Sequence, residues 1–295
     1  MEVAGLRGFD IVEPSSLEEA FGLLGTGDPA VRPMGGGTAL MLMMKSELFK
    51  PTRLVSLRKL GEPFHGLGES ADGKWVRIGA LNTFSMLDHS PLMKSHFPII
   101  SRTMNTLANL RVRNVASVGG NLAHGDPHLD LPPVWMALDG EVRIVGPSGE
   151  RVSAVADLYK GYYETTLEEG ELITELRVPV KPDWKSSYTK VTTRAAHDWP
   201  AIGLAISVQL SGRQIQDLRI VLSAALDKPT RLTAAETVLR GRDIGEALLR
   251  EAADAATEEV ELETDNRGSQ EYKTHLLRIY VTRALQDLVS EAAPK

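Results

Sequence analysis

Three consecutive glycines, Gly35, Gly36 and Gly37, are the feature that most constrains this chain. They lie between an extended segment at residues 31–34 and a Met- and Leu-rich run that starts near Leu40. Backbone without side chains approaches an anion closely, and its N–H groups can point at that anion. The positive end of a following helix would add to this attraction. The loop therefore indicates either a pyrophosphate site or a tight structural turn. Its spacing matches neither the Rossmann nor the Walker A motif, so the loop alone does not decide between them.

A second glycine-rich stretch lies further along the chain and has the same chemistry. Ser117, Gly119, Gly120 and Asn121 follow a β-branched run, so paired glycines are again flanked by a hydroxyl and an amide. Two such loops would clamp one large cofactor with a central pyrophosphate. The alternative is that both are structural turns without a ligand, and spacing alone leaves both interpretations open.

Charge and cysteine content limit the kinds of partner. The net charge of −6 over 295 residues gives no electrostatic reason to expect binding to nucleic acid or to an anionic membrane surface. The absence of cysteine excludes disulfides, thiolate-bound zinc and an iron–sulfur cluster held by this chain. We find neither a signal-peptide pattern nor an apolar run long enough to span a bilayer. We therefore expect a cytoplasmic protein without membrane insertion.

Hydrophobic periodicity predicts a first domain in two parts over residues 1–178. Residues 1–57 indicate a small β-α-β-α-β unit with the glycine loop at its centre. Residues 58–178 indicate a second part, with strands such as 141–145 and a longer helix over about 99–109.

A proline-containing segment at residues 179–183 predicts the boundary to a second domain, residues 179–295. Three strand-like runs follow it, at residues 187–193, 202–210 and 218–222. From Thr233 to the end the pattern is almost purely helical. Strands followed by helices are typical of an α+β domain, here a three-stranded antiparallel sheet with helices.

Two polar segments outside the glycine loops invite a chemical role. The loop from His124 to Asp130 contains two imidazoles and two carboxylates, but its proline and spacing favour a polar loop in a cleft over a metal site. Lys190 and the following Trp199 offer a cation for a phosphate or a flavin and an aromatic ring to pack on a flat cofactor. The alternative for this segment is an exposed basic strand edge. No nucleophile motif is present, so we predict neither a catalytic side chain nor a bound metal.

With both glycine loops in view, the chain resembles the FAD-binding medium subunit of molybdenum hydroxylases, the xanthine dehydrogenase and carbon monoxide dehydrogenase type. The matching stretches are residues 35–40, 113–122, 130–133, 171–173, Arg231 with 234–236, 239–241, 265–273 and 283–285. They occur in the family's order over nearly the whole chain, and this order makes the resemblance specific. One departure is His124-Gly125-Asp126-Pro127, where most relatives read Ala-Ser-Pro. The lack of cysteine excludes the subtype whose flavin subunit carries its own cluster, such as 4-hydroxybenzoyl-CoA reductase.

The resemblance implies a fold and a set of cofactor contacts. The fold is α+β, with a two-part FAD-binding domain of the PCMH/vanillyl-alcohol-oxidase type before the smaller C-terminal domain. The glycine loops would hold the pyrophosphate and ribityl, Asp130 would accept from hydroxyls, and Lys190 would favour the reduced anionic flavin. The implied FAD contacts are Gly35, Gly36, Gly37, Thr38, Ala39, Leu40, Ser117, Gly119, Gly120, Asn121, Asp130, Ile173, Lys190 and Trp199.

The resemblance also implies a function within a larger assembly. A large partner subunit would carry molybdopterin and a small one [2Fe–2S] clusters, as a dimer of heterotrimers. FAD on this chain would pass their electrons to an external acceptor, whether nicotinamide, quinone, cytochrome or oxygen. A stand-alone flavin oxidase of the same fold and a non-catalytic adaptor subunit are the alternatives.

Overall fold

The computed structural model describes residues 8–290, and this part begins with a small three-stranded parallel sheet. Its strands lie in the order β1 (Asp10–Val12), β3 (Arg53–Ser56), β2 (Val31–Met34), with helices α1 (Leu17–Leu24) and α2 (Thr38–Lys45) in the connections. Ser16 caps α1, because its hydroxyl accepts from the Glu19 N–H at 3.2 Å. This confirms the expected β-α-β-α-β unit, and α2 begins at Thr38 rather than Leu40.

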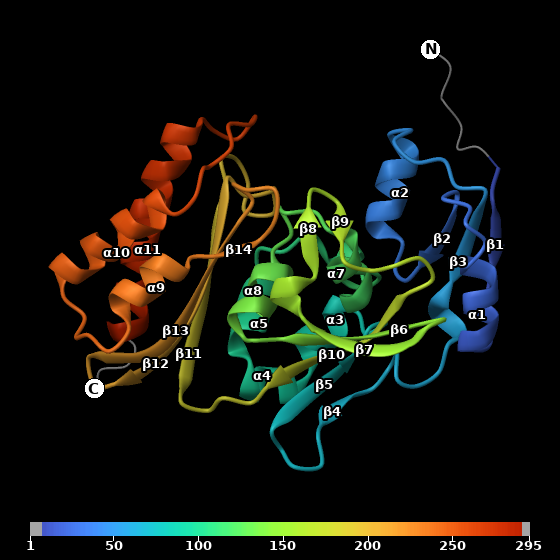
Figure 1. Cartoon of the computed structure of the whole chain (residues 1–295), viewed down its shortest axis with the longest axis horizontal. Coiled ribbons are helices and arrows are strands. Elements are labelled where there is room, and N and C mark those ends of the chain that lie inside the picture. The colour runs from blue at the N-terminus through green and yellow to red at the C-terminus, as the bar shows by residue number, and fades with distance from the viewer. Residues whose placement is uncertain (1–7, 291–295) are drawn as a thin grey trace.

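The second part is a five-stranded antiparallel sheet with helices packed on it (Figure 1). In spatial order the strands are β4 (Leu67–Glu69), β5 (Trp75–Gly79), β10 (Leu172–Pro179), β6 (Glu141–Gly146) and β7 (Gly149–Ala154). The helices are α3 (Phe84–His89), α4 (Pro91–His96), α5 (Pro98–Met104), α6 (Leu110–Arg113), α7 (Val118–His124) and α8 (Leu131–Ala137). Two 3-10 helices, η1 (Leu57–Lys59) and η2 (Val155–Asp157), and a hairpin of β8 (Tyr159–Gly161) and β9 (Glu164–Thr165) complete it.

The single helix expected over residues 99–109 is wrong. Helix α5 ends at Met104, and Ala108 has a positive φ of 46°, which an α-helix does not allow. Asn109 then starts α6, because its side chain accepts from the Val112 N–H at 3.1 Å. An asparagine that caps a new helix competes with continuation of the old one.

The C-terminal part is an antiparallel sheet covered by helices. Its strands lie in the order β11 (Trp184–Val191), β12 (Ile202–Ser211), β13 (Gln214–Ser223) and β14 (Thr230–Arg231). The three expected strands are present, and the two-residue β14 adds a fourth at the edge. Helices α9 (Thr233–Leu239), α10 (Glu246–Glu258) and α11 (Gln270–Ser290) lie on the outer face of the sheet (Figure 1). The last residues of the predicted helical run, 291–295, and residues 1–7 of the first domain lie outside the described residues.

Helix α8 joins the two cores. All seven of its residues are buried, and it packs against β12 and β13 of the C-terminal sheet as well as against α5 and α7 (Figure 1). Residues 202–208 of β12 are continuously buried because helices cover both faces of this sheet. No helix in the described part of the chain has the length and hydropathy of a membrane span.

Candidate functional site

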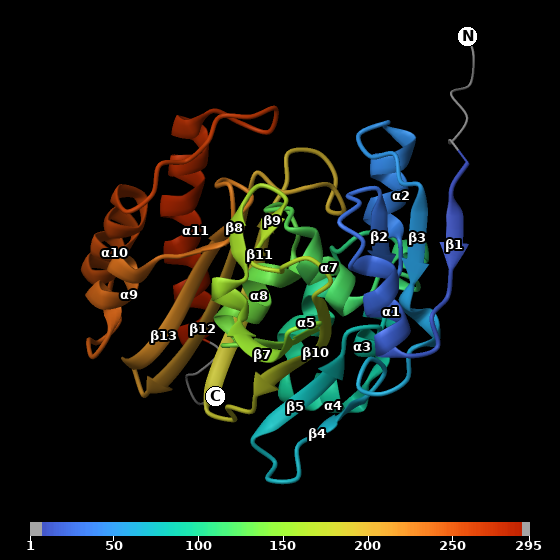
Figure 2. The same ribbon diagram turned by 45° about the vertical axis from the view of Figure 1, so that its right-hand side comes forward.

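The two glycine loops, distant in sequence, are in backbone contact. A Cβ atom on Gly36 would lie 2.0 Å from the carbonyl oxygen of Val115, and one on Gly35 would lie 2.5 Å from Ser117 Oγ. Figure 2 shows the consequence, since α2 of the first unit stands beside α7 of the second. The glycines at 35 and 36 are therefore required by the approach of the two loops, independently of any ligand.

The end of the first loop leaves backbone donors unpaired within its helix. Gly37 has a left-handed φ of 71° and is the N-cap of α2, where it has no side chain to accept from the helix. The first intrahelical bond runs from the Met41 N–H to the Gly37 carbonyl at 2.9 Å. The N–H groups of residues 37–40 therefore have no intrahelical acceptor. An anion such as a pyrophosphate placed here would accept from these N–H groups and be stabilised by the helix dipole.

The second loop differs, because its backbone donors already have acceptors. The Val118 and Gly119 N–H groups donate to the carbonyls of Asn82 and Ala80, at 3.0 and 2.8 Å. The Gly120 N–H donates to Ser117 Oγ at 3.3 Å, so Ser117 caps α7. The two loops thus differ: the first offers unpaired amides, whereas the N–H groups of residues 118–120 in the second are already hydrogen-bonded within the chain.

One side-chain acceptor of the second loop has no donor within residues 8–290. Asn121 Oδ1 is buried and has no hydrogen-bond partner among the described residues. A buried acceptor without a donor is costly, so a hydroxyl or N–H donor supplied by a ligand would stabilise it. The unpaired Asn121 acceptor and the free amides at the start of α2 suit the hydroxyl groups and the pyrophosphate of FAD, so the residues present fit this cofactor.

Asp130 and Lys190 form a buried ion pair between the first domain and the C-terminal sheet. Lys190 Nζ lies 2.9 Å from Asp130 Oδ2 and donates to the Thr106 carbonyl at 3.1 Å; the two charged side chains are 4% and 8% exposed. Tyr188 Oη donates to Asp130 Oδ1 at 2.8 Å. Burial raises the pKa of Asp130, while Lys190 and Tyr188 act against that rise. The basic strand edge considered as an alternative is therefore not exposed at Lys190.

Trp199 lies in a cluster of aromatic and charged side chains from separate loops. Its ring stacks on His128 with centroids 5.2 Å apart, and the Arg267 guanidinium lies 5.1 Å from it. His128 Nδ1 is 3.0 Å from Asp126 Oδ1, and Asp265 Oδ2 is 3.8 Å from Nε2. Within residues 8–290, no three His, Asp or Glu side chains are arranged to hold a metal.

The structure brings together some of the predicted site residues. Gly35 and Gly36 contact the loop of Ser117, and Asp130 contacts Lys190. Ile173 is almost wholly buried in the core, on β10, which packs against α7. Tyr188, His128, Arg267 and Asp265 were not selected, although Tyr188 stands two residues before Lys190 on one strand face. That alternation is the signal by which Tyr188 was detectable.

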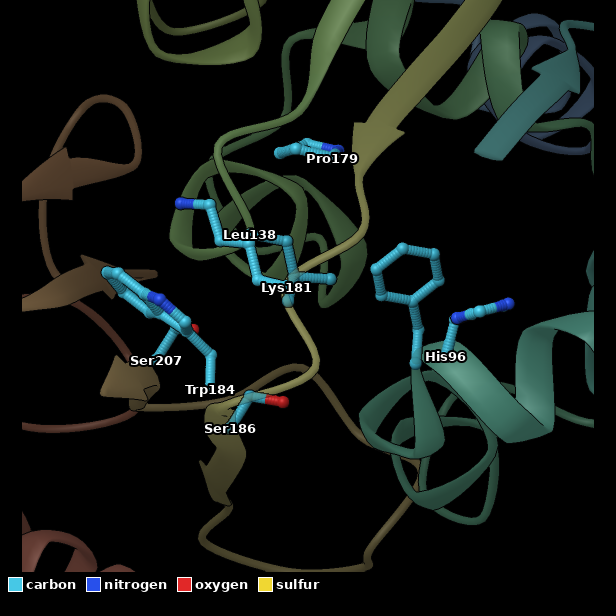
Figure 3. Close-up of a pocket in the computed structure, with 8 residues that line it drawn as sticks. His96, Leu138, Pro179, Lys181, Trp184, Ser186 and Ser207 are labelled. Carbon is cyan, nitrogen blue, oxygen red and sulfur yellow. The ribbon is translucent and has the colours of Figure 1, made fainter. Parts of the chain in front are cut away.

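A separate small cavity lies where β10 passes into β11 (Figure 3). Its lining includes Phe97, Lys181 and Trp184, and its volume of about 20 Å³ holds roughly one water molecule. Lys181 and Arg219 both pair with Asp139 here, and their charges lie 4.1 and 5.3 Å from the Trp184 ring. This region is a junction of the two domains and is too small for a cofactor.

Comparison with known proteins identifies the class. Residues 7–181 match the family described as the FAD binding domain in molybdopterin dehydrogenase. Residues 187–288 match the CO dehydrogenase flavoprotein C-terminal domain. This is a flavoprotein of the α+β architecture described above, and FAD is the cofactor of its first domain.

Relatives that span nearly the whole chain place it more narrowly. The glyceraldehyde dehydrogenase medium chain of Sulfolobus acidocaldarius is 29% identical over 95% of this chain and 98% of its own. The carbon monoxide dehydrogenase medium chain of Afipia carboxidovorans is 32% identical, over 94% and 96%. A chain of the solved structure of carbon monoxide dehydrogenase from Hydrogenophaga pseudoflava matches with a TM-score of 0.91 at 32% identity, over 96% of this chain and 97% of its own. The chain belongs to the family of FAD-binding medium subunits of molybdenum-containing oxidoreductases.

Proposed function

We propose that this chain is the electron-transfer subunit of a heteromeric molybdenum-containing dehydrogenase or hydroxylase. Electrons from the [2Fe–2S] clusters of a small partner subunit would reach FAD on this chain and leave to an external acceptor. A large partner subunit would carry the molybdopterin, the assembly would be a dimer of heterotrimers, and it would work in the cytoplasm. The cofactor supplies the redox chemistry, while the chain binds and orients it.

The observation that carries the proposal is the anion site at the start of α2. Its donors, the N–H groups of residues 37–40, point out of a helix whose N-cap has no side chain, as a bound pyrophosphate requires. Asn121 Oδ1 would accept from the same cofactor, and Lys190 would stabilise the reduced anionic flavin. Ile173 and Trp199 would lie near the ring. Full-length similarity to subunits that are called medium chains supports the partner arrangement.

An absorption spectrum of the chain, purified with its co-expressed neighbours, tests the proposal. We expect flavin bands, two co-purifying subunits, and both iron and molybdenum in the metal analysis. Flavin in an isolated chain that oxidises a small substrate by itself would instead indicate a stand-alone oxidase. A colourless chain that does not bind added FAD would contradict both and favour an adaptor subunit.

A further inference from the structure

The buried pair of Asp130 and Lys190 has a third member in Tyr188. The phenol is held from the same strand as Lys190, two residues earlier, so both side chains point from one face of β11 toward the start of α8. Lys190 contacts one carboxylate oxygen of Asp130 and Tyr188 contacts the other. Each oxygen of this carboxylate therefore has its own donor.

The neighbouring strands leave space for this hydroxyl. Gly203 of β12 pairs with Lys190 on one side and with Ser223 of β13 on the other. A Cβ atom on Gly203 would lie 2.7 Å from Tyr188 Oη and 2.4 Å from Ser223 Oγ. The Ser223 hydroxyl donates to the Gly203 carbonyl at 3.5 Å. The position of the Tyr188 hydroxyl thus requires glycine at residue 203, so the neighbouring strand is shaped to accommodate this hydroxyl.

The charges around Asp130 show what the hydroxyl does. The groups that face this carboxylate are Lys190 and Tyr188 of β11, while Asp126 and His128 of its own loop are paired with each other. Burial favours the protonated form of Asp130, and donors to its oxygens favour the ionised form. Protonation of Asp130 would leave the Lys190 ammonium buried without a counter-charge.

We propose that Tyr188 is a positioning residue of the flavin site, whose hydroxyl keeps Asp130 ionised and aligned with Lys190. The site then presents the cofactor with a balanced pair instead of a lone cation. This inference rests on the proposed function, because it assigns the pair to the surroundings of the bound FAD. It concerns the orientation and charge of groups that the chain itself supplies.

The test compares Tyr188→Phe with Tyr159→Phe. Tyr159 is a matched control, because its hydroxyl is also buried but has no partner among the described residues. The midpoint potential of bound FAD is measured against pH for both variants and the wild type. Each curve of potential against pH should change slope where Asp130 ionises. We expect this change of slope to lie about one to two pH units higher in Tyr188→Phe than in the wild type, because loss of a hydrogen bond to a charged group produces a shift of this size. Below that change of slope the potential rises, since an unbalanced Lys190 favours the reduced anionic flavin.

The same variants without FAD separate this inference from the proposed function. The melting temperature of Tyr188→Phe should fall increasingly below that of the wild type as the pH rises through the raised pKa of Asp130 in the folded chain, because the hydroxyl stabilises only the ionised carboxylate. The deficit of Tyr159→Phe should not change with pH. Gly203→Ala, which displaces the hydroxyl without removing it, should shift both curves in the same direction as Tyr188→Phe.

Two results would overturn the inference. One is a Tyr188→Phe potential curve that superimposes on the wild-type and Tyr159→Phe curves. The other is a melting deficit of the same size at every pH, which would show that the hydroxyl only packs. Failure of the wild type to bind FAD would contradict the proposed function, while the melting comparison would still decide whether Tyr188 keeps Asp130 ionised.

Discussion

At the scale of single residues, the molecule places a full positive charge where water hardly reaches it. The Lys190 side chain is 4% exposed, and its ammonium contacts Asp130 and the Thr106 carbonyl. A buried pair of this kind adds little to stability over an apolar pair, but removal of one partner leaves the other without compensation. The arrangement is therefore sensitive to single substitutions in a way that surface ion pairs are not.

Lys190→Met should lower the free energy of unfolding by about 3–5 kcal/mol, because it leaves Asp130 buried without its cation. Lys74→Met is the control, since Lys74 is well exposed and 3.8 Å from Asp72, and we expect a change within about 0.5 kcal/mol. Denaturant unfolding measures both. In the FAD-loaded protein Lys190→Met should also lower the flavin potential. Unchanged stability, or unchanged potential and turnover, would contradict the respective role of Lys190.

At the scale of elements, the two glycine loops have similar sequences, but the helices that follow them are capped in different ways. Helix α2 starts at a glycine without a side-chain cap, so its first N–H groups remain available. Helix α7 starts at Ser117, and hydrogen bonds to Asn82, Ala80 and Ser117 itself occupy its first N–H groups. The starts of the two helices lie close together, so the second loop packs directly against the first.

Gly36→Ala should destabilise the chain by about 1–3 kcal/mol and weaken FAD binding, because the new methyl would meet the Val115 carbonyl at 2.0 Å. Gly22→Ala is the matched control. Gly22 lies inside α1 with no atom near its missing Cβ, so alanine there should stabilise by about 0.5–1 kcal/mol. Thermal unfolding and titration with FAD measure the two effects. A Gly36→Ala chain with wild-type melting and affinity would show that the loops do not need this approach.

The elements that sequence could predict are those determined by near neighbours. The first unit followed from the alternation of short strands and helices. The break at Ala108 was missed because an amphipathic pattern continues across it while the backbone turns. Tyr188 was detectable from its place two residues before Lys190 on one strand face, although its partner Asp130 was not. The Trp199 cluster was missed because its members come from separate loops, and periodicity carries no information on such distant contacts.

At the scale of the whole molecule, charged residues hold the loop of residues 124–130 to the C-terminal domain. Asp126 orients His128, and Asp265 lies beside both His128 and the fully buried Lys273. Burial acts to raise the pKa of Asp126, but hydrogen bonds from His128 outweigh it, so the pKa is below its usual value. The same balance, with Arg267 and Lys273 as donors, lowers the pKa of Asp265.

Stability should therefore fall in acid. A carboxylate whose pKa is lower in the folded chain stabilises it above the unfolded pKa, about 3.9 for aspartate, and that contribution is lost as the pH falls through the folded value. Asp126→Asn should lower the melting temperature near neutral pH and flatten its decrease below about pH 4. Asp183→Asn, at an exposed position in the domain connection, is the control and should reproduce the wild-type curve. If the melting temperature of Asp126→Asn decreased in acid as steeply as that of the wild type, Asp126 would not contribute to the acid dependence of stability.

Helix α8 is enclosed on every side, with the first domain around it and the C-terminal sheet closing the remaining face. A chain cut after β10 would therefore expose an apolar helix, and this exposed surface favours aggregation of the separated halves. The same enclosure restricts the exchange of halves between relatives. A chimaera made at the segment after Pro179 would inherit one half of an interface, and only a donor whose β12 and β13 match the side chains of this helix would give a working hybrid.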